Sequence, residues 1–502
     1  MRSRNVFIVV FLTAIWATGE SATRPLAPPP KVLEALGSIR ETSLRGDLSF
    51  LASDLLEGRD SPSRGLDIAA NYIAAQFRAA GLEPGVAGDY FQNAEMMSVE
   101  PSFANFQVKL SRGEHELSVA PKDAVLRVAA ALDIKDAPLF KLDLANAELL
   151  NNLTASQLDG KVVITEFNPK LATTLRAANK VLRAAKPALT ILVDRKGATS
   201  RGEPTHRLED PDAPSDQTPR ITLTGDAAAQ FYAALRSGPG GATIRVHLDP
   251  PIRKRAALRN VIGVLRGSDP ALSDTCVLLT AHYDHLGMRA GGTGDRIYNG
   301  ANDDGSGTVS VIAAAGALAM LQERPKRSIV FMTFFGEEEG LVGSKYYAHH
   351  PVWPIEKTIA QLNLEQLGRS DSTEGPQISN ATLTGFDYSD LTSYVQRAGA
   401  STGIRIYKHA QNSDAYFGDS DNLSLAEAGV PAETLAVAFG FPDYHAVGDE
   451  WQKINYANMV KVDRAVTLAV YLMANSDRPV QWNEANPKTA PYIKAWKGNR
   501  EQ

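Results

Sequence analysis

The sequence has a single cysteine, little net charge and, beyond its N-terminal region, no long apolar run. Cys276 is the only cysteine among 502 residues, so no intramolecular disulfide can form, and the stability of the chain must come from its apolar cores. Cys276 lies in "DTCVLLT", and we expect it to be a small buried hydrophobe on a strand. The net charge of -5, without a cluster of Lys and Arg, argues against nucleic acid as the main partner.

Several common catalytic motifs are also absent. There is no Gly-x-Ser-x-Gly turn of a serine hydrolase, no His-Glu-x-x-His helix, and no glycine loop that would bind a phosphate before a helix. No segment after the N-terminal region is long and apolar enough to cross a membrane. We therefore expect no stable membrane insertion once that region is removed.

The N-terminus has the pattern of a secretory signal peptide. Arg2 and Arg4 precede the apolar run "VFIVVFLTAIWATG", and the small residues that follow offer cleavage positions. We predict a signal peptide over residues 1–22, with an N-terminal membrane anchor as the alternative, although the run is short for a membrane span. Export of a chain without disulfides fits a periplasmic or secreted bacterial protein.

The character of the sequence changes along the chain and predicts several units. Residues 31–104 read as helix, loop and helix, whereas 105–250 contain short alternating stretches typical of strands and form a strand-rich insert. Residues 256–475 alternate apolar strands with helices, and 476–502 read as a polar tail. We predict an α/β fold: a mixed, largely parallel sheet with helices on both faces, plus the strand-rich inserted domain.

Histidines and carboxylates follow the predicted strands of the 256–475 unit. In open α/β sheets, ligands bind at the carboxyl ends of the strands. The residues that fall there, or in adjoining loops, are His282, Asp284, Asp303, Asp304, Glu337, Glu338, Glu365 and His445. Each alone would usually be structural or solvated, but their convergence predicts a common site.

This set of side chains favours a pair of metal ions. Imidazole and carboxylate suit zinc, and a carboxylate that bridges two cations loses its repulsion toward its neighbours. Asp303 and Asp304 in "GANDDGSG" are adjacent like charges that such cations would neutralise. Asp284, two residues beyond His282, could orient the imidazole. Glu337 and Glu338 could divide the roles of base and ligand.

Five segments in succession resemble the motifs of the M28 zinc peptidases, the di-zinc aminopeptidase family. They are "AHYDHLG", "NGANDDGSG", "GEEEGLVGS", "NLEQLGR" and "DYHAVGDEWQKI", and their order and spacing match across residues 256–475. The N-terminal helical part is similar to that of the family as well. The 105–250 insert resembles, more weakly, the protease-associated domain of many members.

The resemblance implies a role for each matching residue. It implies two Zn²⁺ ions, or other divalent metals, one held by His282, Asp303 and Glu365, the other by Asp303, Glu338 and His445. It further implies Glu337 as general base, Tyr444 next to the oxyanion, and a cis peptide bond between Asp303 and Asp304. Two positions depart from the family: Glu365 stands where Asp is usual, and Asn422 stands where His is common.

We accordingly expect an exported metallopeptidase that acts on peptide ends, with an aminopeptidase favoured. The alternatives are a carboxypeptidase or dipeptidase of the same fold, a glutaminyl cyclase, and a receptor-like protein that only binds partners. The sequence does not predict the oligomeric state. Four residues match no ligand position; we expect His285, His349 and His350 to be ordinary surface or loop histidines and Glu339 to be exposed.

Overall fold

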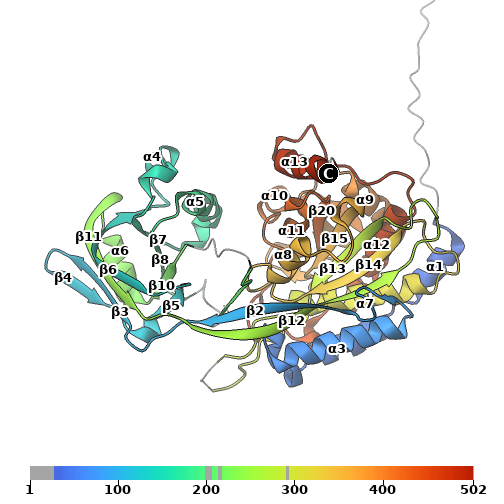
Figure 1. Cartoon of the computed structure of the whole chain (residues 1–502), viewed down its shortest axis with the longest axis horizontal. Helices are drawn as coiled ribbons and strands as arrows, with labels where there is room; N and C mark the ends of the chain where they lie inside the picture. Colours follow the sequence, from blue (N-terminus) through green and yellow to red (C-terminus); the bar gives the residue numbers. More distant parts are fainter. Residues whose placement is uncertain (1–27, 198–205, 213–217, 290–292, 501–502) are drawn as a thin grey trace, which may run out of the picture.

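The computed structural model describes residues 28–197, 206–212, 218–289 and 293–500, so the predicted signal peptide lies outside the described residues. The chain forms two lobes, which a long antiparallel ribbon of β2 (Phe91–Glu100) and β12 (Ile252–Leu265) connects (Figure 1). Among the described residues, no helix has the length and apolar character needed to span a membrane.

The larger lobe is built on a mixed sheet. Its centre is four parallel strands in the order β20 (Ala432–Ala436), β15 (Thr358–Glu365), β13 (Cys276–His282) and β14 (Ser328–Phe334). Antiparallel pairing begins on both sides, where β12 joins β14 and β18 (Asn380–Leu383) joins β20. The predicted α/β class is confirmed. The four central strands are parallel, whereas β12 and β18, which flank them, pair antiparallel.

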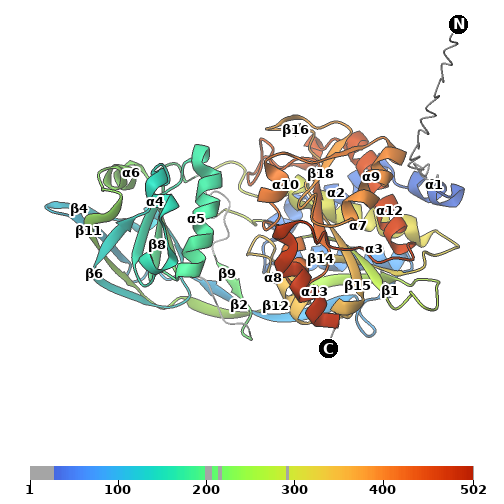
Figure 2. The same ribbon diagram turned by 90° about the horizontal axis from the view of Figure 1, so that it is seen from above.

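Helices cover both faces of this sheet (Figure 2). One face packs against α1 (Pro30–Gly37), α2 (Glu41–Leu51), α3 (Arg64–Ala79), α7 (Ser306–Ala319), α9 (Leu391–Thr402) and α12 (Tyr456–Ala474). The other packs against α8 (Val342–His349), α11 (Asn422–Glu427) and α13 (Ala490–Arg500). Side chains alternate along a strand, so Val277 and Leu279 of β13 enter the first core while Cys276 and Leu278 enter the second. Cys276 is fully buried, as its sequence context predicts.

The segment after residue 476 differs from the polar tail expected from the sequence. Its helix α13 packs on the second core, and Trp482 is buried with its indole Nε1 donating to the carbonyl oxygen of Gly429 at 2.8 Å. The Trp482 ring stacks on Tyr492 at a centroid distance of 5.2 Å. A few aromatic residues thus anchor a segment whose overall composition is polar.

The smaller lobe is a separate sheet with its own cores. Its strand order is β4 (His115–Ser118), β3 (Gln107–Arg112), β11 (Gly238–Leu248), β6 (Leu132–Lys141), β7 (Val162–Glu166), β8 (Leu189–Asp194), β10 (Arg220–Thr224) and β5 (Ala124–Arg127). The helices of this lobe are α4 (Ala147–Asn151), α5 (Ala172–Ala185) and α6 (Asp226–Ala233). One short strand from the same stretch of sequence, β9 (Arg207–Glu209), instead pairs with β2 at the edge of the larger sheet.

A buried carboxyl group lies between α12 and α7 and makes the stability of this packing depend on pH. Asp463 is 1% exposed, and its Oδ1 accepts a hydrogen bond from Ser310 Oγ at 2.7 Å. Burial raises the pKa of Asp463 to about 8. The folded protein therefore retains a proton that the unfolded chain releases near pH 4.

We predict that the free energy of unfolding decreases as pH rises from about 4 to about 8, because ionised Asp463 is disfavoured in the folded state. Each unit of pKa shift corresponds to about 1.4 kcal/mol. In Asp463→Asn, which keeps the acceptor for Ser310, this part of the pH dependence should disappear in urea unfolding curves. The exposed control Glu356→Gln should retain it. An Asp463→Asn profile parallel to that of the wild type would contradict the assignment.

Candidate metal centre

The predicted site residues lie at the carboxyl edge of the central parallel strands. His282 and Glu365 are the last residues of β13 and β15, and Glu337 and Glu338 occupy the turn after β14. Asp303 lies on the short helix Ala301–Gly305, which leads into α7. His445 comes from the loop after β20. Since parallel strands end at the same edge of a sheet, residues far apart in sequence meet there.

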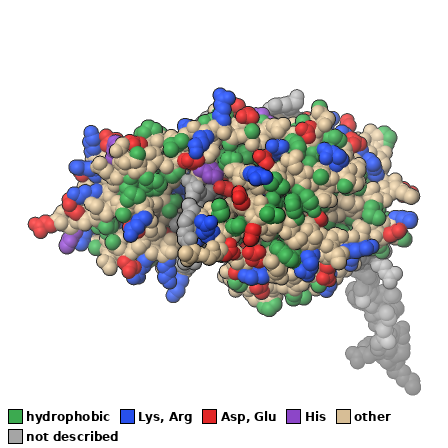
Figure 3. All heavy atoms as spheres, turned by 90° about the horizontal axis from the view of Figure 1, so that it is seen from below, with side chains coloured by type: hydrophobic (Ala, Val, Ile, Leu, Met, Phe, Trp, Pro, Cys, Tyr) green, Lys and Arg blue, Asp and Glu red, His purple; other side chains and the backbone are tan. Residues whose placement is uncertain are grey.

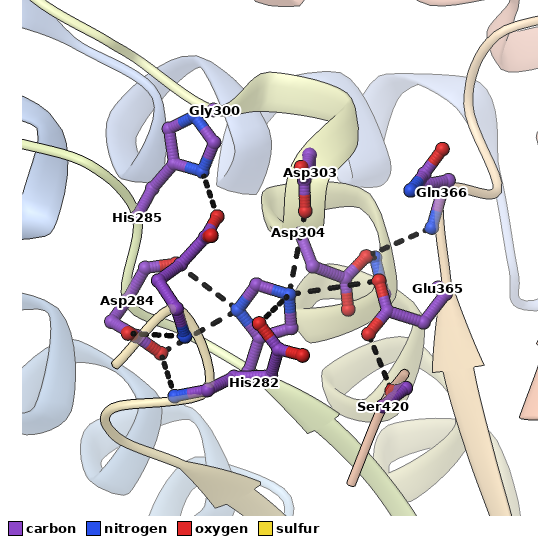
Figure 4. A network of polar contacts seen from close by, with 12 residues as sticks. His282, Asp284, His285, Gly300, Asp303, Asp304, Glu365, Gln366 and Ser420 are labelled. Carbon is purple, nitrogen blue, oxygen red and sulfur yellow. Dashed lines mark hydrogen bonds and ion pairs between the residues drawn. The ribbon is translucent and has the colours of Figure 1, made fainter. Parts of the chain in front are cut away.

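The carboxylate of Asp303 lies between two histidines and connects the two halves of the cluster. Its Oδ1 lies 3.4 Å from His282 Nε2, and its Oδ2 lies 3.2 Å from His445 Nε2. His282 Nε2 is also 3.6 Å from Glu365 Oε2, and His445 Nε2 is 3.3 Å from Glu338 Oε2. The structure therefore brings together all five residues that the resemblance implies as metal ligands. Figure 4 shows the half around His282.

Burial and charge shift the pKa values of this cluster in both directions. Burial would lower the pKa of His445, but Glu338 and Asp303 outweigh it and raise it to about 11. The same histidine, with His285, lowers the pKa of Glu338 to about 2 against the effect of burial. Burial and then the neighbouring carboxylate Glu365 raise the pKa of Glu337 well above its ordinary value. Several carboxylates thus lie together in a buried site, where burial disfavours their ionised form. A bound cation would stabilise the ionised form.

Several buried polar atoms of the cluster have no hydrogen-bond partner. They include His282 Nε2, Asp303 Oδ2 and Asp304 Oδ2. Such atoms are costly unless a ligand occupies the space they face. His282, Asp304 and Glu365 offer donor atoms within 4.8 Å of one another, and so do His285, Asp303 and Glu338. With imidazole and carboxylate as donors, the cluster fits zinc.

Two of the residues expected to be peripheral are buried at the site, and these expectations are wrong. His285 is 1% exposed, and its Nδ1 lies 2.8 Å from Glu338 Oε1, which leaves the other Glu338 oxygen facing His445. Glu339 is 7% exposed, because the turn after β14 folds it inward. The position of His285 three residues after His282 was the available signal. His349 and His350 are exposed at the end of α8, as expected.

Asp284 and Asp304 support the cluster through the backbone. Asp284 accepts hydrogen bonds from the amides of Glu337 at 3.2 Å and Glu338 at 3.4 Å, so it positions the acidic turn. Its Oδ1 lies 3.5 Å from His282 Nδ1, and its own carbonyl oxygen is closer, at 3.2 Å. Asp304 Oδ1 accepts from the amides of Gly307 and Gln366 at 3.0 and 3.1 Å.

The glycines of "GANDDGSG" make room for the acidic side chains. A Cβ on Gly307 would lie 2.2 Å from Asp304 Oδ2, and one on Gly300 would lie 2.4 Å from His285 Cγ. Gly300 also has a φ of 55°, which L side chains rarely adopt. The peptide bond between Asp303 and Asp304 is cis, as the resemblance implies.

Two residues that we did not single out from the sequence hold the loops in place. Arg59 is 1% exposed and donates to the carbonyl oxygens of Leu51, Tyr283, Asn299 and Gly300. Asp449 accepts from the amides of Asn302 and Asp303 at 2.9 to 3.0 Å. Both act on main-chain groups, and nothing in the local sequence indicates such distant partners.

The two residues with implied catalytic roles lie on the accessible side. Glu337 Oε2 is 4.0 Å from His282 Nε2, and the Glu337 side chain is 13% exposed against 1% for His282. Tyr444 is 45% exposed, and its ring stacks on His445 at a centroid distance of 4.0 Å. On the face in Figure 3, acidic side chains and a histidine lie close together where the two lobes meet.

The sequence of this lobe matches a known peptidase family. Residues 260–470 match the profile of "Peptidase family M28". This segment is a peptidase family M28 domain. It contains every residue of the cluster, from His282 to His445.

Relatives and solved structures agree with the M28 fold. Aminopeptidase YwaD of Bacillus subtilis is 27% identical over 221 residues, 42% of this chain and 44% of that protein. The probable glutamate carboxypeptidase LAMP1 of Arabidopsis thaliana is 25% identical over 244 residues, 46% of this chain and 33% of that protein. The structure of BSAP, a zinc aminopeptidase from Bacillus subtilis, has a TM-score of 0.54 at 18% identity, covering 91% of this chain and 98% of that one. The matches thus span less than half the length of these two relatives.

We predict that Arg59→Met lowers the free energy of unfolding by about 3 to 5 kcal/mol, because it leaves buried carbonyl oxygens on three segments without a donor. Urea unfolding compared with the wild type measures the change. Arg64→Met, which removes an exposed guanidinium five residues later, is the matched control and should change stability little. Equal stability of the two variants would show that Arg59 does not hold the loops together.

Proposed function

We propose that the chain is a zinc-dependent exopeptidase that removes residues from the N-terminal end of peptides. The observation that carries the proposal is the position of Asp303, whose two carboxylate oxygens face His282 on one side and His445 on the other. A carboxylate with a histidine and a further carboxylate at each oxygen has the donor set for two cations. The M28 domain and the aminopeptidase relative support the same activity.

The proposed ligands divide into two sets that share Asp303. His282 and Glu365 complete one set, and Glu338 and His445 complete the other. We assign His285 to positioning Glu338, since it occupies one Glu338 oxygen and leaves the second toward His445. When bound, zinc supplies Lewis acidity toward the scissile carbonyl and the attacking water.

Glu337 is the proposed general base. Its carboxylate lies beside the cluster, with Oε2 4.0 Å from His282 Nε2, and burial raises its pKa, so it can hold a proton between two steps. It would accept the proton of the attacking water and donate it to the leaving amine. Asp284 holds the amide of Glu337 and thereby the position of this carboxylate. The exposed ring of Tyr444, stacked on His445, is the proposed donor toward the oxyanion.

The purified protein should shorten peptides of mixed sequence from their N-termini, stop when a chelator is added, and resume with zinc. Mass spectrometry of the products reads both the end that is attacked and the metal dependence. Glu337→Gln should lower kcat by about 100-fold or more, because an amide cannot accept the proton, while bound zinc stays unchanged. The surface variant Glu323→Gln should behave as the wild type.

The products of the same experiment distinguish the alternatives. Shortening from the C-terminus would identify a carboxypeptidase, and hydrolysis of dipeptides alone would identify a dipeptidase. Cyclisation of N-terminal glutamine without shortening would identify a glutaminyl cyclase. No zinc-dependent change in any peptide would contradict the proposal and favour a binding protein.

We also propose that the chain is exported, on the basis of its N-terminal pattern. When the full sequence is expressed in a bacterial host, the protein recovered from the periplasm or medium should lack approximately residues 1–22. The intact mass measures the cleavage position. Full-length protein in the membrane fraction would instead indicate that the apolar run is an anchor.

A further inference from the structure

A second cluster of metal-binding side chains lies beside the acidic turn, apart from the five proposed ligands. It consists of Asp60, His206 and Glu339, whose donor atoms all lie within 4.8 Å of one another. His206 Nε2 is 3.6 Å from Glu339 Oε1 and 3.9 Å from Asp60 Oδ1. These three residues come from three segments: the loop before α3, the segment of β9, and the turn after β14.

One oxygen of each carboxylate in this cluster is buried without a hydrogen-bond partner, although the Asp60 side chain as a whole is 27% exposed. The Glu339 side chain is 2% exposed, and both Glu339 Oε1 and Asp60 Oδ1 are buried without a hydrogen-bond partner. The His206 side chain is 8% exposed and points its Nε2 between them. His206 Nε2 faces the carbonyl oxygen of Ser61 at 2.6 Å, so it does not serve these two carboxylate oxygens, and their burial without a donor is costly unless a ligand is present.

The surrounding charge favours a cation. Burial raises the pKa of Asp60, His206 opposes this, and the nearby carboxylates of Asp284 and Glu338 raise it further. Burial raises the pKa of Glu339 well above its ordinary value although the nearby Arg127 guanidinium opposes this, and Arg127 also donates to the carbonyl oxygen of His206 at 2.7 Å while Arg207 pairs with Glu209. The cluster is therefore a buried space with several carboxylates around one imidazole.

We propose that Asp60, His206 and Glu339 bind a divalent transition-metal ion, separate from the metals of the peptidase site. One imidazole and two carboxylates form a donor set that suits zinc, and the imidazole disfavours calcium and magnesium. The carbonyl oxygen of Ser61, 2.6 Å from His206 Nε2, is a fourth candidate oxygen beside this donor set. Four protein ligands and burial are typical of a structural rather than a catalytic zinc ion.

Such an ion would connect the β9 segment, which belongs to the predicted insert, to the turn that carries Glu337 and Glu338. His206 directly precedes β9, which pairs with β2 at three positions and places Leu208 in the core of the larger lobe. Ser61 Oγ accepts a hydrogen bond from the amide of Gly336, so the same segment already contacts the start of the acidic turn. The ion would thus hold the β9 segment next to the peptidase site.

The metal content of the full-length chain tests this proposal directly. Wild type, His206→Gln and His247→Gln are saturated with zinc, desalted, and analysed by inductively coupled plasma mass spectrometry. His206→Gln should contain about one ion per chain less than the wild type. His247 is the matched control, since it also lies within 4 Å of two carboxylates, Asp133 and Asp249, but is 43% exposed. Equal zinc in wild type and His206→Gln overturns the proposal.

A second measurement does not depend on how the variants fold. Crystals of the zinc-saturated wild type, measured at the zinc absorption edge, should show an anomalous peak between Asp60, His206 and Glu339. Absence of that peak overturns the proposal, even if peaks appear beside Asp303. A peak here without peptidase activity would leave this site established while the proposed function fails, so the two outcomes are separable.

Discussion

The structure depends on holding several carboxylates close together in a space from which water is largely excluded. Asp303, Glu338 and Glu365 converge there, and His282 and His445 face their oxygens. Left alone, such a group of like charges would raise pKa values or open the site. Burial and Glu365 raise the pKa of Glu337, whereas His445 and His285 lower the pKa of its neighbour Glu338.

Hydrogen bonds to main-chain groups hold the loops of the site in place. The side-chain oxygens of the proposed metal ligands therefore stay available for metal binding. Asp284 holds the acidic turn and Asp449 holds the loop of Asp303, each through backbone amides. Arg59 donates to the carbonyl oxygens of Tyr283, Asn299 and Gly300, next to Asp284 and to the loop of Asp303. The two carboxylates accept hydrogen bonds from backbone amides, and the guanidinium donates hydrogen bonds to backbone carbonyl oxygens. This arrangement resembles the outer hydrogen bonds that orient ligands around metals in general.

The central strands and the convergent ligands could be predicted from the sequence because both follow local rules. Apolar runs that end in His282 or Glu365 identify strands and the edge where they stop. Burial that depends on tertiary contacts could not be predicted in this way. Only its position three residues after His282 distinguishes His285, which is buried against Glu338, from the exposed His349, and Glu339 is buried beside Asp60 and His206, which are distant from it in the sequence. The packing of Trp482 likewise depends on a partner more than 50 residues away.

The two departures from the family pattern belong to one local arrangement. Glu365 is longer by one methylene than the usual Asp, and Ser420 Oγ donates to its Oε1 at 2.6 Å, leaving Oε2 toward His282. The residue that replaces the common His, Asn422, faces away from the cluster: it donates to the carbonyl oxygen of Phe417 and accepts from Thr434. Asn422 thereby supports the turn that presents Ser420. Asn363 connects the two positions, since its Nδ2 donates to Ser420 Oγ at 2.8 Å and to Thr434 Oγ1 at 3.2 Å, so the hydroxyl that binds Glu365 and the one that binds Asn422 share a donor.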